Sequence, residues 1–329
     1  MCMELIDLVK KITSYSEIGV LNVLETIIEA KYGKDKVTKT NDFLVAEGNI
    51  PVALVAHADT VFSIPPKLFF HDKEEDVLWS PQGLGADDRA GIAAILSIIS
   101  EGLFPHLIIT TKEEMGGLGA QMLIRQFPQC PFKELHYIVE LDRRGYNDCV
   151  FYECENPKFI KYVESFGFSF NIGSFTDISI ICPLWGVAGV NLSVGYEEEH
   201  SKGEYLNLTY LTHTIQKVKK MLKQADRSKI FKYIKSNKSF YGYYGKGYAY
   251  DDGMPCDNCG EMIDFYDCIN IRTPNNGLKM VCLHCFSKMR DISLCKTCGD
   301  WFITKNPNAI ECESCKTKAQ KGIKNKHVL

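Results

Sequence analysis

The stretch PVALVAHADT, residues 51–60, decides the fold. Its apolar run, 52–56, predicts a buried strand that ends at once in two polar residues, His57 and Asp59. Downstream, GADDRAGIAAILSIIS (85–100) begins with Gly and Asp and continues as an apolar helix. A buried strand followed by an apolar helix is typical of an α/β sheet with crossover connections.

The same alternation of short apolar runs and helical periodicities continues on both sides of this stretch. Helices are predicted before the first strands, and a long helix with apolar positions over 208–222 closes this part of the chain. Further strands are predicted at 43–46, at 107–111, at 136–140 and at the start of 186–207. We therefore expect an α/β fold with a doubly wound, mixed and mostly parallel sheet flanked by helices.

The composition is that of a globular protein, with 45% hydrophobic and 24% charged residues among 329 and a formal net charge of −3. This charge argues against general coating of nucleic acid. The amino end lacks the apolar core of a signal peptide, and no run of about 18 apolar residues occurs. We expect a cytoplasmic protein that does not contact a membrane.

Cysteines divide the chain into two regions. Five of the 14 are scattered over the first 250 residues, whereas nine lie between Cys256 and Cys315, eight of them in four CxxC pairs. A disulfide scaffold is unexpected without a secretory signal, and paired CxxC motifs suit tetrahedral zinc. The predicted ligands of two structural zinc ions are Cys256, Cys259, Cys282, Cys285, Cys295, Cys298, Cys312 and Cys315. The simplest pairing joins the first two motifs and the last two, with a crossed pairing as the alternative, and Cys268 is assigned to packing.

The predicted domains are a catalytic domain over 1–238, a Gly- and Tyr-rich linker over 239–255, and a double zinc-ribbon region over 256–329. The end of the chain, KTKAQKGIKNKHVL (316–329), is basic. It is compatible with a nucleic-acid partner, with a protein partner, or with a solvated tail that has neither.

Polar residues follow directly after several predicted strands. Ligands of open α/β sheets bind at the carboxyl edge of the strands, so these residues are expected to converge there. Asp87 and Asp88, at the start of a helix, belong to the same edge. The residues that follow strands are His57, Asp59, Glu113, Glu114, Asp142 and His200.

Imidazoles and carboxylates gathered at one edge are the donors that two adjacent divalent cations need. The predicted ligands are His57, Asp87, Glu114, Asp142 and His200, with Asp87 able to bridge. Asp59 is spaced to hold the second ring nitrogen of His57, and Glu113 is the natural general base. Plain structural interpretations also exist, since an Asp pair often caps a helix and a Glu pair is often solvated.

The segments HADTV, GADDRAG, EEMGGLGA and ELD, followed by a late histidine, resemble the co-catalytic zinc exopeptidases. That group includes tripeptidase T, the glutamate carboxypeptidases, and the tetrahedral and leucyl aminopeptidases. The resemblance covers roughly residues 50–210 and implies a zinc exopeptidase fold.

The resemblance also implies a role for each matched residue. His57 and Asp142 would bind one zinc, Glu114 and His200 the other, and Asp87 would bridge them. Glu113 would assist a metal-bridging hydroxide in attacking an amide carbonyl, and Asp59 would orient His57.

This chain departs from the family pattern in two places. The carboxypeptidase branch has a whole domain between the positions of Asp142 and His200, where this chain has 57 residues. The tetrahedral branch has one between the positions of His57 and Asp87, where this chain has 29. The layout therefore resembles the compact leucyl aminopeptidases, and substrate selection by a lid domain is not implied.

The implied activity is that of an aminopeptidase or other exopeptidase on small peptides, with two zinc, cobalt or manganese ions in the site. Two alternatives stay open: an N-acyl amino-acid hydrolase, and a non-catalytic hydrolase-like scaffold that presents zinc ribbons to a protein or nucleic-acid partner. Several nearby residues have either a substrate-binding or a structural interpretation, namely Arg89, Arg143, Arg144 and Asp177. His213, in a helical pattern, is a weaker rival of His200.

Overall fold

The structure is a computed structural model that describes residues 4–225, 230–236, 254–263, 268–274 and 277–317. The chain divides into two compact units, residues 1–240 and 241–329. The expected linker (239–255) up to residue 253 and the basic end from residue 318 lie outside the described residues. Within the described ranges, no helix has both the length and the apolarity needed to cross a bilayer.

The first unit is built around an eight-stranded sheet with the strand order β1-β2-β6-β3-β7-β10-β8-β9. The four central strands, β6, β3, β7 and β10, are parallel, and β2 and β8 pair antiparallel on either side of them. The strands are β1 (Val37–Lys39), β2 (Phe43–Ala46), β3 (Ile50–His57), β6 (Pro105–Thr110), β7 (Tyr137–Arg143), β8 (Asp148–Val150), β9 (Ser169–Phe170) and β10 (Gly189–Ser193). The expected mixed and mostly parallel α/β sheet is confirmed.

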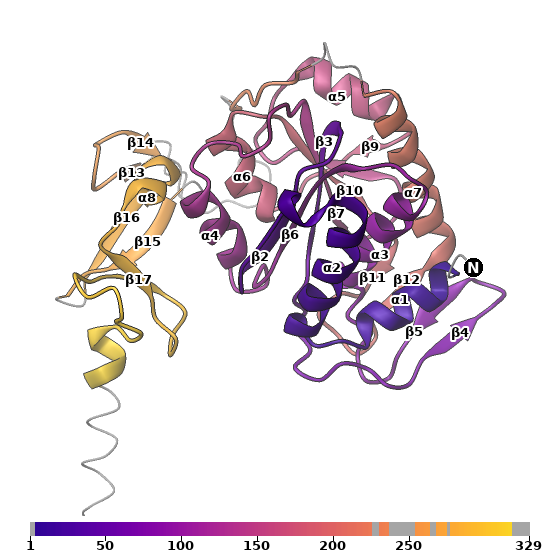
Figure 1. Ribbon diagram of the computed structural model, residues 1–329, viewed down its shortest axis with the longest axis horizontal. Coiled ribbons are helices and arrows are strands. Elements are labelled where there is room, and N and C mark those ends of the chain that lie inside the picture. Colours follow the sequence, from indigo (N-terminus) through magenta and orange to yellow (C-terminus); the bar gives the residue numbers. More distant parts are fainter. Residues whose placement is uncertain (1–3, 226–229, 237–253, 264–267, 275–276, 318–329) are drawn as a thin grey trace, which may run out of the picture. The chain divides into compact units, whose positions relative to one another are not determined.

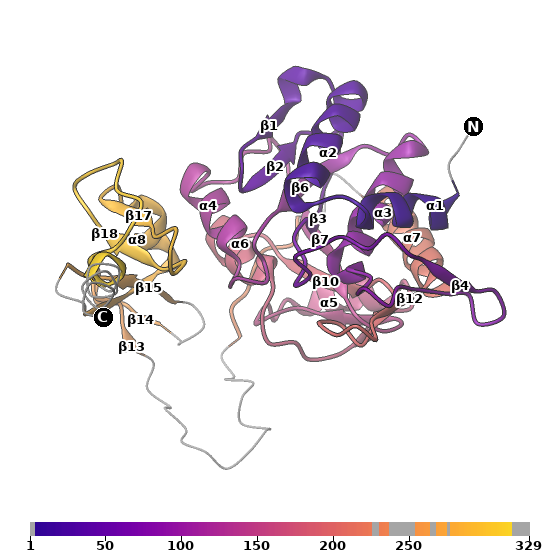
Figure 2. The ribbon, with the colours of Figure 1, turned by 90° about the horizontal axis from the view of Figure 1, so that it is seen from below.

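Helices cover the two faces of this sheet and make a three-layer arrangement (Figures 1 and 2). Helices α4 and α6 pack together on one face, and the other helices pack on the opposite face around the main apolar core. Their bounds are α1 (Leu5–Thr13), α2 (Glu17–Tyr32), α3 (Ala86–Ser100), α4 (Leu118–Gln126), α5 (Pro157–Glu164), α6 (Asp177–Trp185) and α7 (Leu208–Lys223), with a 3₁₀ turn at Lys34–Lys36.

Helix α3 can be buried at the centre of its layer because most of its residues are small or apolar. It packs against β3, β7, α1 and α7, and its side chains from Ala86 to Leu96 are all buried. Gly91 makes the approach to β7 possible, since a Cβ atom there would lie 2.1 Å from the carbonyl oxygen of Leu141. This packing holds the start of α3 beside the end of β7.

A second, antiparallel sheet with the order β11-β12-β5-β4 joins two distant segments of the first unit. Its strands are β4 (Phe70–Asp72), β5 (Val77–Trp79), β11 (Tyr196–Glu197) and β12 (Tyr205–Asn207). The β5–β12 pairing connects the segment between His57 and Asp87 to the loop that carries His200. This sheet was not predicted from the sequence.

The second unit is a small β structure. Its elements are β13 (Met254–Pro255), β14 (Met262–Ile263), β15 (Cys268–Arg272), β16 (Leu278–Cys282), α8 (Leu283–Lys288), β17 (Ile292–Leu294) and β18 (Trp301–Ile303). Strand β15 pairs with β16 on one side and with β18 on the other, so a single sheet runs through both halves of the unit. The rings of Phe286 and Trp301 pack edge to face at 4.9 Å between their centroids.

Candidate metal centre

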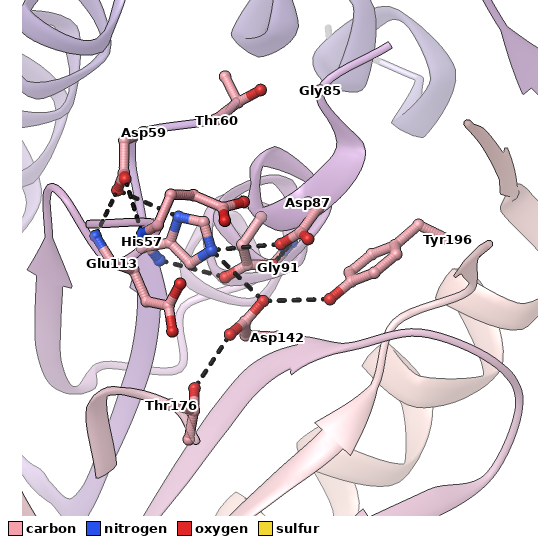
Figure 3. Close-up of polar contacts among 12 residues, drawn as sticks. His57, Asp59, Thr60, Gly85, Asp87, Gly91, Glu113, Asp142, Thr176 and Tyr196 are labelled. Carbon is pink, nitrogen blue, oxygen red and sulfur yellow. Dashed lines mark hydrogen bonds and ion pairs between the residues drawn. The ribbon is translucent and has the colours of Figure 1, made fainter. Parts of the chain in front are cut away.

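The fold brings the predicted site residues to the carboxyl edge of the central strands. His57 ends β3, Asp142 lies near the end of β7, and Asp87 lies in the first turn of α3. Glu113 and Glu114 follow β6, and His200 lies between β11 and β12. Residues 57 and 200, more than 140 positions apart in the sequence, therefore meet at one place. Figure 3 shows His57 together with Asp87 and Asp142.

His57 lies at the centre of this cluster, with only 1% of its surface exposed. Its Nε2 atom lies 3.2 Å from Oδ1 of Asp87 and 3.5 Å from Oδ1 of Asp142. Its Nδ1 atom lies 3.2 Å from Oδ1 of Asp59 (Figure 3). The imidazole thus presents one nitrogen to the two carboxylates and the other nitrogen to Asp59.

His200 makes a second set of contacts from the opposite side. Its Nε2 atom lies 3.2 Å from Oδ2 of Asp87 and 2.9 Å from Oε1 of Glu114. Asp87 therefore points one carboxylate oxygen toward His57 and the other toward His200. This is the geometry that a carboxylate shared by two cations requires.

Two overlapping sets of donor atoms result, each within a span of 4.8 Å. One consists of His57, Asp87 and Asp142, and the other of Asp87, Glu114 and His200. A third set contains His57, Glu113 and Glu114, which puts the Glu113 carboxylate beside both of the first two.

The charge at this place fits cations. Burial raises the pKa of Glu113 to about 9 and that of Asp142 to about 6, because these carboxylates are packed with others away from water. Burial alone would raise the pKa of Asp87, but hydrogen bonds from His200 and His57 outweigh burial and lower it. Imidazole nitrogens and carboxylate oxygens at these separations are suitable donors for zinc or a similar divalent ion.

Asp59 fixes the position of two segments at once. Besides its contact with His57, its carboxylate accepts hydrogen bonds from the backbone N–H groups of Glu113 and Glu114, both at 3.1 Å. Although burial opposes it, the His57 imidazole and these N–H groups hold the pKa of Asp59 below its usual value. Asp59 thus ties the turn after β6 to the end of β3.

Asp87 and Asp88 point in different directions, and the peptide bond between them is cis. The Asp88 carboxylate accepts hydrogen bonds from the backbone N–H groups of His57 (3.1 Å) and Gly91 (3.0 Å). Asp88 is completely buried and makes these backbone contacts, whereas Asp87 faces the two histidines.

Three residues of the site were missed in the sequence analysis. Glu204 is buried, and its carboxylate accepts hydrogen bonds from the backbone N–H groups of Gly85 (2.5 Å) and Asp87 (2.9 Å). The hydroxyl groups of Thr176 and Tyr196 donate to Asp142 at 3.0 and 3.2 Å. A signal existed only for Glu204, a lone acid four residues after His200 on the predicted ligand loop.

The nearby arginines are engaged in the protein itself. Nη1 of Arg89 donates to the backbone carbonyls of Ile12 (3.0 Å) and Tyr15 (2.9 Å). Arg143 lies 3.6 Å from a carboxylate oxygen of Asp148, and the exposed Arg144 lies 2.9 Å from one of Glu199. These contacts favour the structural interpretation of all three.

The other open candidates are also structural. Asp177 is the first residue of α6, is fully buried, and accepts a hydrogen bond from the Thr110 hydroxyl. A substrate amine therefore has no access to it. His213 lies in α7, and its Nδ1 atom faces the Tyr146 hydroxyl at 3.4 Å.

In the second unit the cysteines form two groups of four. Cys256, Cys259, Cys282 and Cys285 lie together, as do Cys295, Cys298, Cys312 and Cys315, with the sulfur atoms of each group within 4.8 Å of one another. The pairing of CxxC motifs is thus sequential rather than crossed.

The two cysteine groups repeat the same local geometry. The backbone N–H of Cys282 points to the sulfur of Cys256 at 3.3 Å, and that of Cys312 points to the sulfur of Cys295 at 3.4 Å. Burial alone would raise the pKa of these thiols, but such backbone N–H groups lower the pKa of Cys256 and that of Cys295 to about 6. Four convergent sulfurs, one of which in each group has a lowered pKa, fit a zinc-ribbon-like site.

No known protein-family profile and no curated protein matches this chain. Among solved structures, a tripeptidase from Staphylococcus aureus is 16% identical over 67% of this chain and 97% of its own, with a TM-score of 0.51. A TET aminopeptidase from a marine sediment thaumarchaeote is 13% identical over 69% and 98%, with a TM-score of 0.54. An aminopeptidase from the archaeon Desulfurococcus kamchatkensis is 16% identical over 69% and 96%, with a TM-score of 0.51. In its large mixed sheet and flanking helices, this chain has the fold of these tripeptidase and aminopeptidase structures.

Proposed function

We propose that this chain is a metal-dependent exopeptidase that hydrolyses small peptides from their amino end with two zinc ions. The observation that carries the proposal is the position of Asp87, whose two carboxylate oxygens face two separate donor sets. The fold shared with tripeptidase and aminopeptidase structures supports a peptidase. Under this proposal, His57 and Asp142 hold one zinc, Glu114 and His200 the other, and Asp87 is shared.

The bound cations would supply Lewis acidity, which polarises the amide carbonyl and acidifies the attacking water. With cations bound beside it, whose charge would lower its raised pKa, Glu113 would take the proton from the water and deliver it to the leaving amine. Its carboxylate lies beside the donor sets but belongs to neither of the two that share Asp87. Asp59 keeps the His57 ring in orientation and holds the backbone of Glu113. Thr176 and Tyr196 fix the Asp142 carboxylate.

The direct test is turnover of amino-acid amides, dipeptides and N-acyl amino acids by protein loaded with zinc or cobalt. We expect hydrolysis of the amides and dipeptides, and a loss of roughly 10²- to 10⁴-fold in kcat for Glu113→Gln. The matched control, Glu74→Gln, changes an exposed carboxylate of the turn between β4 and β5 and is expected to match the parent.

The other two functions give different results in the same experiment. Turnover confined to N-acyl amino acids would indicate the deacylase. If fully metallated protein turned over nothing, and Glu113→Gln bound metal like the parent, the chain would be a scaffold and the proposal would be wrong.

For the second unit we propose one structural zinc in each group of four cysteines. The convergence of the sulfurs and the lowered pKa of Cys256 and Cys295 support it. Because a unit of this size has little apolar core, the metals would supply much of its folding free energy. A protein or nucleic-acid partner for this unit stays a prediction, tested by salt-dependent binding with and without residues 316–329.

A further inference from the structure

A cavity of about 320 Å³ lies in the first unit, between the turn that joins α1 to α2 and the loop that follows Asp59. Its walls are mainly apolar and aromatic, and two charged residues also line it. The lining residues that matter here are Tyr15, Glu17, Phe62, Pro66, Leu84 and Arg89. The roles proposed above for the metal centre do not use this cavity.

The cavity begins at the first residues beyond the metal centre. Thr60 and Gly85 also line it, the first directly after Asp59 and the second two positions before Asp87. In Figure 3, Thr60 and Gly85 lie on the same side of the cluster around His57. A Cβ atom on Gly85 would lie 3.2 Å from Oγ1 of Thr60, so the two loops are in contact there. The cavity thus lies beside the two loops that lead to Asp59 and Asp87.

The walls of the cavity are held in place by buried contacts. Arg89 is only 2% exposed, and its two hydrogen bonds to the carbonyls of Ile12 and Tyr15 tie the α1–α2 turn to the start of α3. On the other wall, Phe62 packs over Gly83, where a Cβ atom would lie 2.3 Å from the ring. A cavity that is formed before its ligand arrives binds with a smaller entropic cost.

Of the two charged residues in the lining, Glu17 is the one available to a ligand. The guanidinium group of Arg89 is buried on backbone carbonyls, whereas Glu17, the first residue of α2, is half-buried. The Thr111 hydroxyl and the cations of Lys112 and Arg89 also act on Glu17. Lys112 is paired with Asp42 at 2.6 Å, and Arg89 is held by backbone carbonyls. Asp59 adds a second negative charge on the same side. The cavity therefore offers apolar walls and the half-buried carboxylate of Glu17, while the Arg89 cation in its lining is only 2% exposed.

We propose that this cavity is the side-chain subsite of the peptidase and that it accepts a lysyl or arginyl residue, whose cation pairs with Glu17. The aliphatic stem of such a side chain packs on Tyr15, Phe62 and Leu84, while its charged end reaches the carboxylate. This inference rests on the proposed function, since it names the substrate class of the same site.

The test compares lysyl and norleucyl amides, which have similar stems and differ in charge, as substrates of the zinc-loaded protein. We expect the parent to prefer the lysyl amide. In Glu17→Gln, kcat/KM for the lysyl amide is expected to fall roughly 10-fold or more, because a charge-assisted contact is lost, while the value for the norleucyl amide changes little. The matched control on the same helix, Glu29→Gln, keeps the parent preference.

A second variant fills the cavity without changing its charge. Ser63→Phe is expected to reduce hydrolysis of both long side chains and to spare the alanyl amide. Metal content and thermal unfolding, measured on each variant, separate these effects from misfolding.

The outcomes distinguish this inference from the proposed function. If peptides are hydrolysed but Glu17→Gln keeps the parent ratio of lysyl to norleucyl rates, the subsite assignment is wrong and the peptidase stands. If no amide is hydrolysed, the peptidase proposal fails, and calorimetric binding of lysinamide still reports on the cavity. Binding that is equal in the parent and in Glu17→Gln overturns the inference.

Discussion

At the scale of single residues, Glu204 has the clearest untested role. The Glu204 carboxylate accepts hydrogen bonds from the backbone N–H groups of Gly85 and Asp87. Glu204 itself lies on the loop that carries His200. Removing the negative acceptor leaves these buried N–H groups poorly satisfied. We expect Glu204→Gln to weaken metal binding at the centre by about 10- to 100-fold.

Competition with a chelator of known zinc affinity measures this change. Glu198→Gln is the matched control, since Glu198 is an exposed acid on the same loop. Equal affinity in the parent and in Glu204→Gln would show that the loop needs no such support.

The residues of the candidate centre could be predicted by reasoning from local patterns, because most of them follow strands and Asp87 begins a helix. The same reasoning failed for Thr176 and Tyr196, which contact Asp142 from elements 34 and 54 positions away. A hydroxyl group at such a separation carries no local signal, so only the tertiary packing reveals its partner.

At the scale of elements, the close packing of α3 on β7 positions Asp87 beside Asp142. Gly91→Ala would place a Cβ atom 2.1 Å from the Leu141 carbonyl oxygen, so the helix and strand must separate. We expect a loss of at least about 1–3 kcal/mol in the free energy of unfolding. Chemical denaturation of the metal-free protein measures it.

Gly19→Ala in α2 is the comparison for this variant. There the nearest atom to an added Cβ is a serine oxygen at 3.1 Å, and alanine favours a helix, so the change is expected to stay within about 1 kcal/mol. Equal effects of the two substitutions would contradict the packing argument.

The central strands were predictable from their apolar runs, and β2 (Phe43–Ala46) has the predicted bounds. Strands β4, β5, β8 and β9 were not predicted, because each has only two or three residues. Pairing with a distant strand, rather than local preference, makes such short segments extended.

The shared sheet of the second unit predicts that its two cysteine groups depend on each other. Strand β15 belongs to the first half and β18 to the second, and Arg272 and Asp300 form an ion pair at 2.5 Å across their junction. We expect Cys298→Ser, in the second group, to increase amide hydrogen exchange in β15 and β16 as well. Cys268→Ser, which lies outside both groups, is the control, and unchanged protection of β15 in Cys298→Ser would show two independent halves.

At the scale of the whole molecule, the two units together predict about four zinc ions per chain. Replacing His57 and His200 by alanine should remove two of them, and replacing Cys259 and Cys298 by serine should remove the other two. Elemental analysis of the purified protein checks these numbers. A parent value of two would eliminate either the candidate metal centre or the cysteine sites, and the variants would show which.

The pairing of β5 with β12 has a consequence for the order of events on the ribosome. The donors of the candidate metal centre span residues 57 to 200, and the loop bearing the last of them is anchored by the pairing of residues 205–207 with 77–79. A nascent chain thus cannot assemble that centre until nearly the entire first unit has been synthesised. Each cysteine group, in contrast, spans only 30 or 21 consecutive residues (256–285 and 295–315), so its four sulfurs can come together soon after that short piece emerges.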